Sequence, residues 1–229
     1  RLSTMKILFT KTSIEKEVSE KLGADFICGF QDFITIEHTK VKPFSLKNYS
    51  LIFSSVNAVK SFFKNEFKPN ENFQDKNYNK IYCVGLKTKR EIRRKGFGTY
   101  KVTKHASELS DFIIDYCARE RFLHFCGNLA LDVLDKTLPL QNISYKKVIV
   151  YKTNLLYPKI SEKYDAIVFF SPSGVRSFAK FNSLEHLKLF SIGQTTEKEL
   201  RNFTENRIFT SKESNLEDLL NIIKQKAES

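Results

Sequence analysis

Short apolar runs alternate with amphipathic stretches along most of the chain. Several runs end in Gly, Ser or Asn, as buried strands do when they lead into a turn. The stretches between them repeat apolar residues at spacings of three and four, which predicts helices packed on a sheet. Strands that alternate with helices predict an α/β fold with parallel sheets. The expected strands are 6–10, 25–28, 33–37, 50–54, 80–84, 100–103, 122–126, 144–151, 166–170, 187–192 and 207–210.

Helical periodicity is clearest in six of the stretches between these strands. The first begins at Ser13, which we expect to cap it. The segment 87–95, KTKREIRRK, also has helical spacing; it predicts a solvated helix face, with a surface for polyanions as the alternative. The polar segment 64–80 predicts an exposed loop or a helix end. The six expected helices are 13–22, 57–67, 108–120, 129–138, 195–203 and 215–226.

The chain contains an internal repeat. LIFSSVNAVKSF (51–62) resembles VFFSPSGVRSF (168–178), with Ser55 aligned to Ser171 at an offset of 116. CVGLKTKREI aligns with SIGQTTEKEL at an offset of 108, and YKVTKHASELSDFI with RIFTSKESNLEDLL at an offset of 107. Three collinear segments at nearly constant offset indicate that one α/β half has been duplicated.

The repeats are not arranged as a simple tandem. FLHFCGNLALDVLDKTL has no counterpart near the chain end, and its counterpart is the N-terminal KILFTKTSIEKEVSEKL. We therefore expect two parallel-sheet α/β domains of duplicated topology, joined by a two-stranded antiparallel β ladder. One domain is discontinuous, 5–32 plus 154–229; the other, 39–145, is inserted; and 33–38 and 146–153 form the ladder, which we expect to act as a hinge.

Composition narrows the class of ligand. The 229 residues carry 38 Lys and Arg against 26 Asp and Glu, a net charge of +12, which attracts polyanions: nucleic acid, an anionic membrane or an acidic small molecule. Most of the 21 Phe residues occur in core-like runs and not on basic stripes, which disfavours nucleic acid. No apolar run approaches the ~20 residues that span a bilayer, and the start has no signal-peptide pattern. We expect a cytoplasmic protein that binds neither nucleic acid nor membrane.

Cysteine and histidine provide no metal motif. Cys28, Cys83, Cys117 and Cys126 have no CxxC spacing and are expected to be reduced thiols, and the four histidines form no HxxxH or HExxH. We expect no metal. Residues 1–4 precede Met5 and the first strand, and we expect them to be dispensable.

Small, hydroxyl and amide residues follow the expected strands. They stand at 54–57, 85–88, 126–128, 171–174 and 193–196. Ligands of open parallel sheets bind beyond the carboxyl ends of the strands, where the N–H groups at helix starts suit carboxylates and phosphates. The alternative is that each Ser or Thr only caps its own helix. Nucleotide-binding loops, a GxSxG motif and a Ser/His/Asp set are all absent, so an enzyme here would work by positioning and backbone hydrogen bonds.

The ordered motifs LIFSSVNAVKSF, CVGLKT, LHFCGN, VIVYKT, VFFSPSGV and SIGQTT resemble those of the uroporphyrinogen-III synthase family across nearly all of 5–226. The resemblance implies a lyase, specifically a cyclising hydro-lyase, that converts hydroxymethylbilane into uroporphyrinogen III with inversion of ring D and loss of water. It implies no cofactor. The substrate is rich in carboxylates, which gives the positive net charge a purpose.

The resemblance also implies roles for single residues. Tyr151, in VIVYKT, corresponds to a family tyrosine whose phenol could assist departure of the substrate hydroxyl; the alternative is a tyrosine packed in a ladder. Lys11 stands where the family often has Arg, and so keeps the charge without the bidentate fork. The expected substrate-binding residues are Ser55, Thr88, Gly127, Asn128, Ser171, Ser173, Thr196 and Lys11.

Two other functions remain open at this point. A two-domain protein that binds an anionic small molecule without catalysis has the same architecture, and a nucleic-acid binder fits the isoelectric point near 9.4. For the synthase we expect a monomer, with hydroxymethylbilane as the ligand and a transient contact with porphobilinogen deaminase as the protein partner to be tested.

Overall fold

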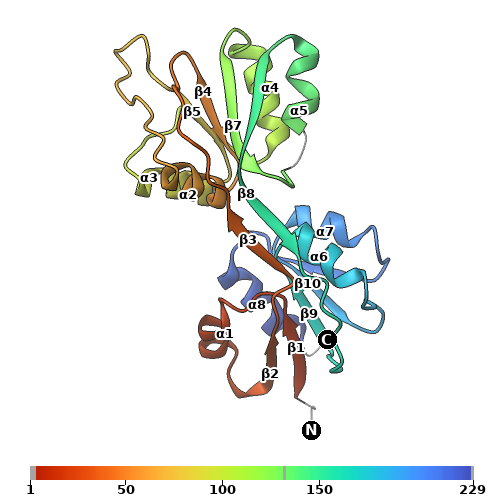
Figure 1. The fold of residues 1–229 in the computed structure, drawn as a ribbon. Coiled ribbons are helices and arrows are strands. Elements are labelled where there is room, and N and C mark those ends of the chain that lie inside the picture. Colours follow the sequence, from red (N-terminus) through yellow and green to blue (C-terminus); the bar gives the residue numbers. More distant parts are fainter. Residues whose placement is uncertain (1–3, 131–132, 228–229) are drawn as a thin grey trace. The chain divides into compact units, whose positions relative to one another are not determined.

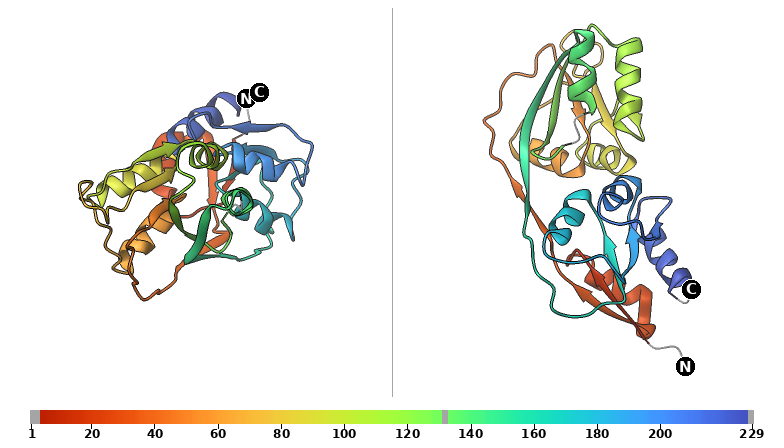
Figure 2. Two further views of the ribbon diagram at one scale, coloured as in Figure 1. Left: turned by 90° about the horizontal axis from the view of Figure 1, so that it is seen from above. Right: turned by 90° about the vertical axis from the view of Figure 1, so that its right-hand side faces the viewer.

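The computed structural model describes residues 4–130 and 133–227, so the expectation about residues 1–4 lies outside it except at Thr4. The chain forms two compact units. One combines Arg1–Thr35 with Asn154–Ser229, and the other is Ile36–Thr153. We refer to them as the discontinuous unit and the inserted unit. Both ends of the described chain belong to the discontinuous unit (Figure 2).

The inserted unit is built on a sheet with the strand order β3-β8-β7-β4-β5-β6. Strands β8, β7, β4, β5 and β6 pair in parallel. The strands are β3 (Ile34–His38), β4 (Ser50–Phe53), β5 (Ile81–Val84), β6 (Lys101–Thr103), β7 (Arg121–Gly127) and β8 (Ser144–Leu155). The helices are α2 (Val56–Lys64), α3 (Leu86–Arg94), α4 (Ala106–Tyr116), α5 (Val133–Thr137) and the 3₁₀ helix η2 (Pro139–Gln141).

Helices cover both faces of this sheet (Figure 1). Val59 and Phe62 of α2 and Ile92 of α3 pack on one face, and Leu109 of α4 and Leu134 of α5 belong to the core of the other. The central strand β4 is therefore buried along its whole length, which explains why its sequence is a continuous apolar run without alternation.

The discontinuous unit has a five-stranded sheet with the order β11-β10-β9-β1-β2, in which every pair is parallel. Its strands are β1 (Met5–Phe9), β2 (Phe26–Phe30), β9 (Ala166–Phe169), β10 (Lys188–Ser191) and β11 (Ile208–Thr210). Its helices are α1 (Glu15–Leu22), the 3₁₀ helix η1 (Gly23–Asp25), α6 (Pro172–Ala179), α7 (Gln194–Leu200) and α8 (Leu216–Lys226). α1 and α8 contribute to the core on one face, and α6 and α7 to that on the other.

The two sheets have the same topology. The order β8-β7-β4-β5-β6 in one matches β2-β1-β9-β10-β11 in the other. The last four strands of each order are followed by corresponding helices, while β8 and β2 lead into the strands β9 and β3. β1, from the chain start, pairs with β9, as the missing counterpart of the repeat predicted. The predicted fold class is confirmed, including the duplicated topology.

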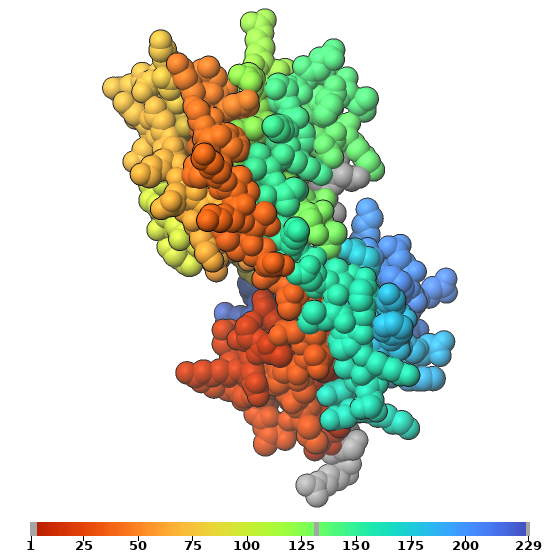
Figure 3. Space-filling view, viewed as in Figure 1, coloured from red at the N-terminus to blue at the C-terminus, as the bar shows by residue number. Residues whose placement is uncertain are grey.

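An antiparallel pair of strands, β3 and β8, links the units. The Thr39 N–H donates to the Val150 carbonyl at 2.9 Å, and the Leu156 N–H donates to the Phe33 carbonyl at 2.9 Å. The two strands run side by side at the surface, orange and teal in Figure 3. β8 is longer than expected and extends to Leu155, because its first part pairs with β7 and it also pairs with β3. That the ladder acts as a hinge stays a prediction.

The predicted cap of the first helix is wrong. Ile14 occupies the N-cap position of α1 and makes no side-chain cap hydrogen bond. The reason lies one residue before Ser13. The Thr12 N–H and hydroxyl both donate to the Asp32 carboxylate, at 2.9 and 2.8 Å, and this anchors the approach to the helix.

Candidate functional site

The carboxyl edge of the inserted unit's sheet brings together four of the predicted site residues. Ser55 follows β4, Gly127 ends β7, Asn128 comes next, and Tyr151 lies on β8. Gly127 and Tyr151 are register partners, and the pairing is irregular between Cys126 and Gly127. Motifs nearly a hundred residues apart in sequence thus meet at the edge where α/β proteins bind ligands.

Ser55 and Tyr151 share a hydrogen bond between their hydroxyl groups, Oγ to Oη, at 3.0 Å. Ser55 is also the N-cap of α2, since its Oγ accepts from the Ala58 N–H at 3.2 Å. The capping alternative therefore holds for Ser55, but capping uses only one lone pair of its hydroxyl. The same hydroxyl holds the phenol in place.

The hydroxyl pair has one proton to spare. Burial raises the pKa of Tyr151, with a smaller rise from Cys126, while the hydrogen bond from Ser55 opposes it. The phenol is therefore protonated at neutral pH. Two O–H groups share a single hydrogen bond, so whichever of them donates to the other, one proton remains for a ligand.

Gly127 leaves room for the Tyr151 ring. A Cβ at position 127 would lie 2.5 Å from two ring carbon atoms and 2.9 Å from the phenol oxygen. Real Cβ contacts of that length do not occur, so any larger residue would displace the ring. Gly127 thus acts on Tyr151 through the absence of a side chain.

Asn128 ties the end of β7 to β8. Its N–H donates to the Tyr151 carbonyl at 3.2 Å, and its Oδ1 accepts from the Thr153 N–H at 2.9 Å. Both bonds flank Tyr151 along the strand. The exposed Asn128 side chain therefore helps to position Tyr151 in this structure.

Thr88 and Thr196 are almost fully buried, with exposed fractions of 4% and 3%. Each stands in the first turn of its helix, α3 or α7, after a glycine N-cap. Gly85 has a φ of 92°, a left-handed conformation that only glycine adopts without strain. Because the hydroxyls are buried, ligand binding by these turns would have to rely on their backbone N–H groups.

In the discontinuous unit, Ser171 repeats the cap geometry of Ser55. Its Oγ accepts from the Gly174 N–H at 3.0 Å and lies 3.4 Å from the Ser173 Oγ. Its φ and ψ, −160° and 156°, match the −152° and 152° of Ser55. Lys11 is exposed, with its Nζ 5.9 Å from the centre of the Phe170 ring. Ser171 and Ser173 therefore adjoin each other, while Lys11 follows a different strand, β1.

A buried histidine near the site was not predicted. His124, in the middle of β7, bonds the Ser54 Oγ through Nε2 at 2.8 Å and the Tyr145 phenol through Nδ1 at 2.6 Å. Burial lowers the pKa of His124 to about 4; the charge of Lys147 adds to this, and Asp135 opposes it. The sequence signal was only a lone histidine within an apolar strand, LHFC, which is more often structural than functional.

A second polar cluster lies at the opposite edge of the same sheet. The Glu120 Oε1 accepts from the Ser50 hydroxyl at 2.6 Å and from the Tyr82 hydroxyl at 2.8 Å, and Oε2 accepts from the Lys80 ammonium at 3.2 Å. Burial works against ionisation of this carboxyl, but the three donors hold its pKa below the usual value. The cluster joins the amino ends of neighbouring strands and lies far along them from Tyr151.

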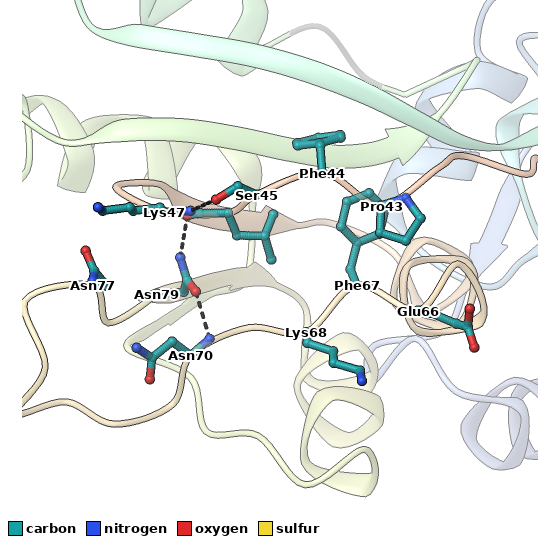
Figure 4. Close-up of a pocket in the computed structure, with 11 residues that line it drawn as sticks. Pro43, Phe44, Ser45, Lys47, Glu66, Phe67, Lys68, Asn70, Asn77 and Asn79 are labelled. Carbon is teal, nitrogen blue, oxygen red and sulfur yellow. Dashed lines mark hydrogen bonds between the residues drawn. The ribbon is translucent and has the colours of Figure 1, made fainter.

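The inserted unit also has a surface pocket of about 440 Å³ that none of the predicted site residues lines. Figure 4 shows its asparagine-rich wall, in which Asn79 receives the Asn70 N–H at 2.8 Å and donates to the Leu46 carbonyl at 2.8 Å. The first bond joins two parts of the segment 64–80, and the second ties that segment to Leu46, before β4. They also satisfy the buried amide of Asn79, so the pocket has no unpartnered polar group there aimed at a ligand.

No group of three or more His, Cys, Asp or Glu side chains suited to a metal occurs in residues 4–130 and 133–227. All four cysteines are free, and three of them are buried. Over the same described part of the chain, no helix has the length and apolar character needed to cross a membrane.

The family model described as uroporphyrinogen-III synthase HemD matches residues 26–221. The resemblance drawn from the motifs is thereby confirmed. Among curated protein sequences, none is similar enough to this chain to count as a match.

Two solved structures share the fold over nearly the whole chain. Uroporphyrinogen-III synthetase from Helicobacter pylori is 19% identical, with a TM-score of 0.63, 96% of this chain covered and 99% of the other. A mutant uroporphyrinogen III synthase from the extremely thermophilic bacterium Thermus thermophilus is 12% identical, with a TM-score of 0.68 and 98% of both chains covered. At these identities the likeness concerns the fold alone.

Proposed function

Because the chain belongs to the uroporphyrinogen-III synthase HemD family, we propose that it cyclises hydroxymethylbilane to uroporphyrinogen III, inverting ring D and releasing water. The reaction class is that of a cyclising hydro-lyase. It needs control over the shape of a flexible chain more than a strong acid or base.

The observation that carries the proposal is the arrangement around Tyr151. Ser55 bonds its hydroxyl, Gly127 makes room for its ring, and Asn128 bonds its backbone. Three separate motifs thus converge on one phenol at the ligand-binding edge of a parallel sheet. A buried phenol also needs a partner when it only packs, so the proposal is supported by the convergence of the three motifs at this edge and not by the bond at 3.0 Å alone.

The spare proton of the Ser55–Tyr151 pair would assist loss of the substrate hydroxyl. As the C–O bond of the hydroxymethyl group breaks, negative charge develops on the departing oxygen, and a hydrogen bond to that oxygen stabilises it. The raised pKa of Tyr151 makes full proton transfer costly. The pair therefore contributes by hydrogen bonding, and the proton that completes the water is balanced by the proton that the substrate releases from the attacked pyrrole carbon when the ring closes.

Helix starts and positive charge would hold the carboxylate arms of the substrate. The first turns after Ser55 and Ser171 contain N–H groups that have no acceptor within the helix, which suit carboxylates. α6 offers fewer of them than α2, because Pro172 has no N–H, and in both helices one of them already bonds the cap serine. Ser173, Thr88 and Thr196 contribute in the same way from their first turns. The exposed Lys11 and the net charge of +12 attract the polyanion from solution.

A coupled assay with porphobilinogen deaminase tests the proposal. The deaminase supplies hydroxymethylbilane, which closes without enzyme to the symmetric type I isomer. We expect the chain to divert the product to the type III isomer, resolved by chromatography after oxidation. Only type I product, at any protein concentration, would reject the synthase function.

The second candidate is a two-domain protein that binds an anionic small molecule without catalysis. It predicts binding of the bilane or its product without any change in the isomer ratio, so the same assay separates the two functions. A monomeric state, a cytoplasmic location, hinge motion at the ladder and transient contact with the deaminase remain predictions.

A further inference from the structure

A chain of three hydrogen-bonding side chains crosses the inserted unit's sheet. It runs from Tyr145 on β8 through His124 on β7 to Ser54, directly after β4. His124 is 2% exposed, so both ring nitrogens depend on these two hydroxyls. Ser54 is partly exposed and precedes Ser55, which holds Tyr151. The series of hydrogen bonds from Tyr145 to Ser54 therefore runs from the interior to the edge where the candidate site lies.

The chemistry of the two hydroxyls indicates which way the protons point. The Tyr145 hydroxyl lies 2.6 Å from Nδ1 and the Ser54 hydroxyl 2.8 Å from Nε2. A phenol is more acidic than a serine hydroxyl, so it is the better donor and the poorer acceptor of the two. Tyr145 then donates to Nδ1, and Nε2–H donates to Ser54. A neutral imidazole has one donor and one acceptor nitrogen, so the first bond dictates the second.

Protonation at neutral pH agrees with this assignment. Burial lowers the pKa of His124 and raises that of Tyr145, so the ring is neutral and the phenol keeps its proton. The Ser54 oxygen then accepts from the histidine, and its own O–H is left to donate. Within residues 4–130 and 133–227, the contact with His124 is the one hydrogen bond found for the Ser54 side chain.

We propose that Ser54 donates its hydroxyl proton to a carboxylate of the substrate, and that His124 and Tyr145 are positioning residues that set this direction. The inference rests on the proposed function and adds a substrate contact to it. A buried histidine with satisfied nitrogens explains the fold on its own. That explanation does not account for the partly exposed Ser54 hydroxyl, which ends the series of hydrogen bonds beside the Ser55–Tyr151 pair.

A double-mutant cycle in the coupled assay tests the proposal. Ser54→Ala removes the donor, and we expect KM to rise about tenfold, the effect of losing one hydrogen bond to a charged group, with kcat nearly unchanged. Ser54→Thr keeps the hydroxyl and should restore KM. Tyr145→Phe frees Nδ1, so the imidazole can change tautomer, and KM should rise severalfold.

The double variant decides between positioning and simple packing. If Tyr145 acts through Ser54, Tyr145→Phe will not raise KM further once Ser54 is alanine. Additive effects would overturn the positioning role, and an unchanged KM for Ser54→Ala would overturn the substrate contact. Tyr82→Phe is the matched control, because its hydroxyl lies at the other edge of the sheet with Glu120; its KM should equal that of the wild type.

Two further readouts keep the result clear. Nitrogen-15 NMR of the wild-type protein should find His124 neutral with its proton on Nε2, and a proton on Nδ1 would overturn the assignment even if Tyr145→Phe fails to fold. A wild-type protein that forms no type III isomer would reject the proposed function and this inference together. A wild-type protein that forms it while Ser54→Ala keeps its KM would reject the inference alone.

Discussion

At the scale of single residues, the candidate site depends on one phenol and what surrounds it. Tyr151→Phe removes only the hydroxyl and leaves the ring in place over Gly127. If the Ser55–Tyr151 pair supports the departing oxygen, we expect the rate of type III formation to fall by about 100-fold, within the range seen for proton-donating side chains. Rates are measured in the coupled assay, and thermal unfolding should change little.

Tyr164→Phe is a matched control for this variant. The Tyr164 ring also lies against a glycine, Gly29, but in the discontinuous unit and with its hydroxyl toward Glu162. Its rate should stay at the wild-type value. Equal rates for Tyr151→Phe and the wild type would remove Tyr151 from the reaction.

Gly127→Ala tests the position of the Tyr151 ring and not its hydroxyl. The new Cβ would lie 2.5 Å from the Tyr151 ring carbons, so the ring must move and the bond to Ser55 at 3.0 Å must break. We expect a loss of activity similar to that of Tyr151→Phe, together with a destabilisation of about 1–3 kcal/mol from overpacking. Activity and urea unfolding are measured side by side.

Gly98→Ala provides the comparison, since nothing lies within 4 Å of the Cβ it would add. It should leave both activity and stability unchanged. Full activity in Gly127→Ala would mean that the ring position is not needed for the reaction.

At the scale of helices and strands, the sequence predicted the eleven strands found within residues 4–130 and 133–227, to within a few residues at either end. The central strands β4 and β9 were clear because burial on both faces requires continuous apolar runs. The cap of α1 was missed because Thr12 bonds Asp32, 20 residues away. The chain from Tyr145 to Ser54 was missed for the same reason: His124 reaches 21 and 70 residues along the sequence, and no local pattern encodes such partners.

For the candidate site, the sequence predicted which residues follow the strands but not which side chains they contact. The repeat located its serines, and both are helix caps, as ordinary strand-to-helix turns require. That Ser55 also bonds Tyr151 depends on β8 lying beside β7, which is a property of the sheet. That the Thr88 hydroxyl is buried depends on how α3 packs, so a spacing argument cannot decide it.

Strand β7 gives the protein a predictable sensitivity to acid. The pKa of His124 is about 4 in the folded chain, below the usual 6.5, so the unfolded chain takes up a proton first as the pH falls. The stability that the neutral His124 allows is therefore present above pH 6.5, and this contribution is lost as the pH falls from 6.5 to 4. From pH 7 to pH 5 the loss from this one group is roughly 2 kcal/mol, measured as the change in unfolding free energy in urea.

His124→Gln should reduce this dependence, because glutamine does not titrate. His105→Gln, which replaces an exposed histidine, should keep the full wild-type loss between pH 7 and pH 5. If His124→Gln and the wild type lost the same free energy over that interval, the acid sensitivity would have to come from other groups.

At the scale of the whole molecule, the architecture and the net charge contribute to ligand binding in different ways. The duplicated sheets supply two sets of strand-to-helix turns from one ancestral pattern, and the net charge of +12 acts on any polyanion before contact. The helix α3 carries the densest basic cluster, with Arg90 and Arg93 exposed and Ile92 buried, which is the pattern of a solvated face. We therefore attribute the attraction to the net charge and not to α3.

Ionic strength tests that attribution. Raising the salt from about 25 mM to about 300 mM shortens the screening length severalfold, so KM for the bilane should rise severalfold while kcat stays constant.

Neutralising Arg90 and Arg93 to Gln removes two charges from α3, and neutralising Lys16 and Lys224 to Gln removes two from α1 and α8. If the net charge steers the substrate, both pairs will raise KM by the same small factor at low salt and by none at high salt. A larger effect of the α3 pair that persists at high salt would mean that α3 contacts the substrate directly, since a direct contact is screened less than a long-range attraction.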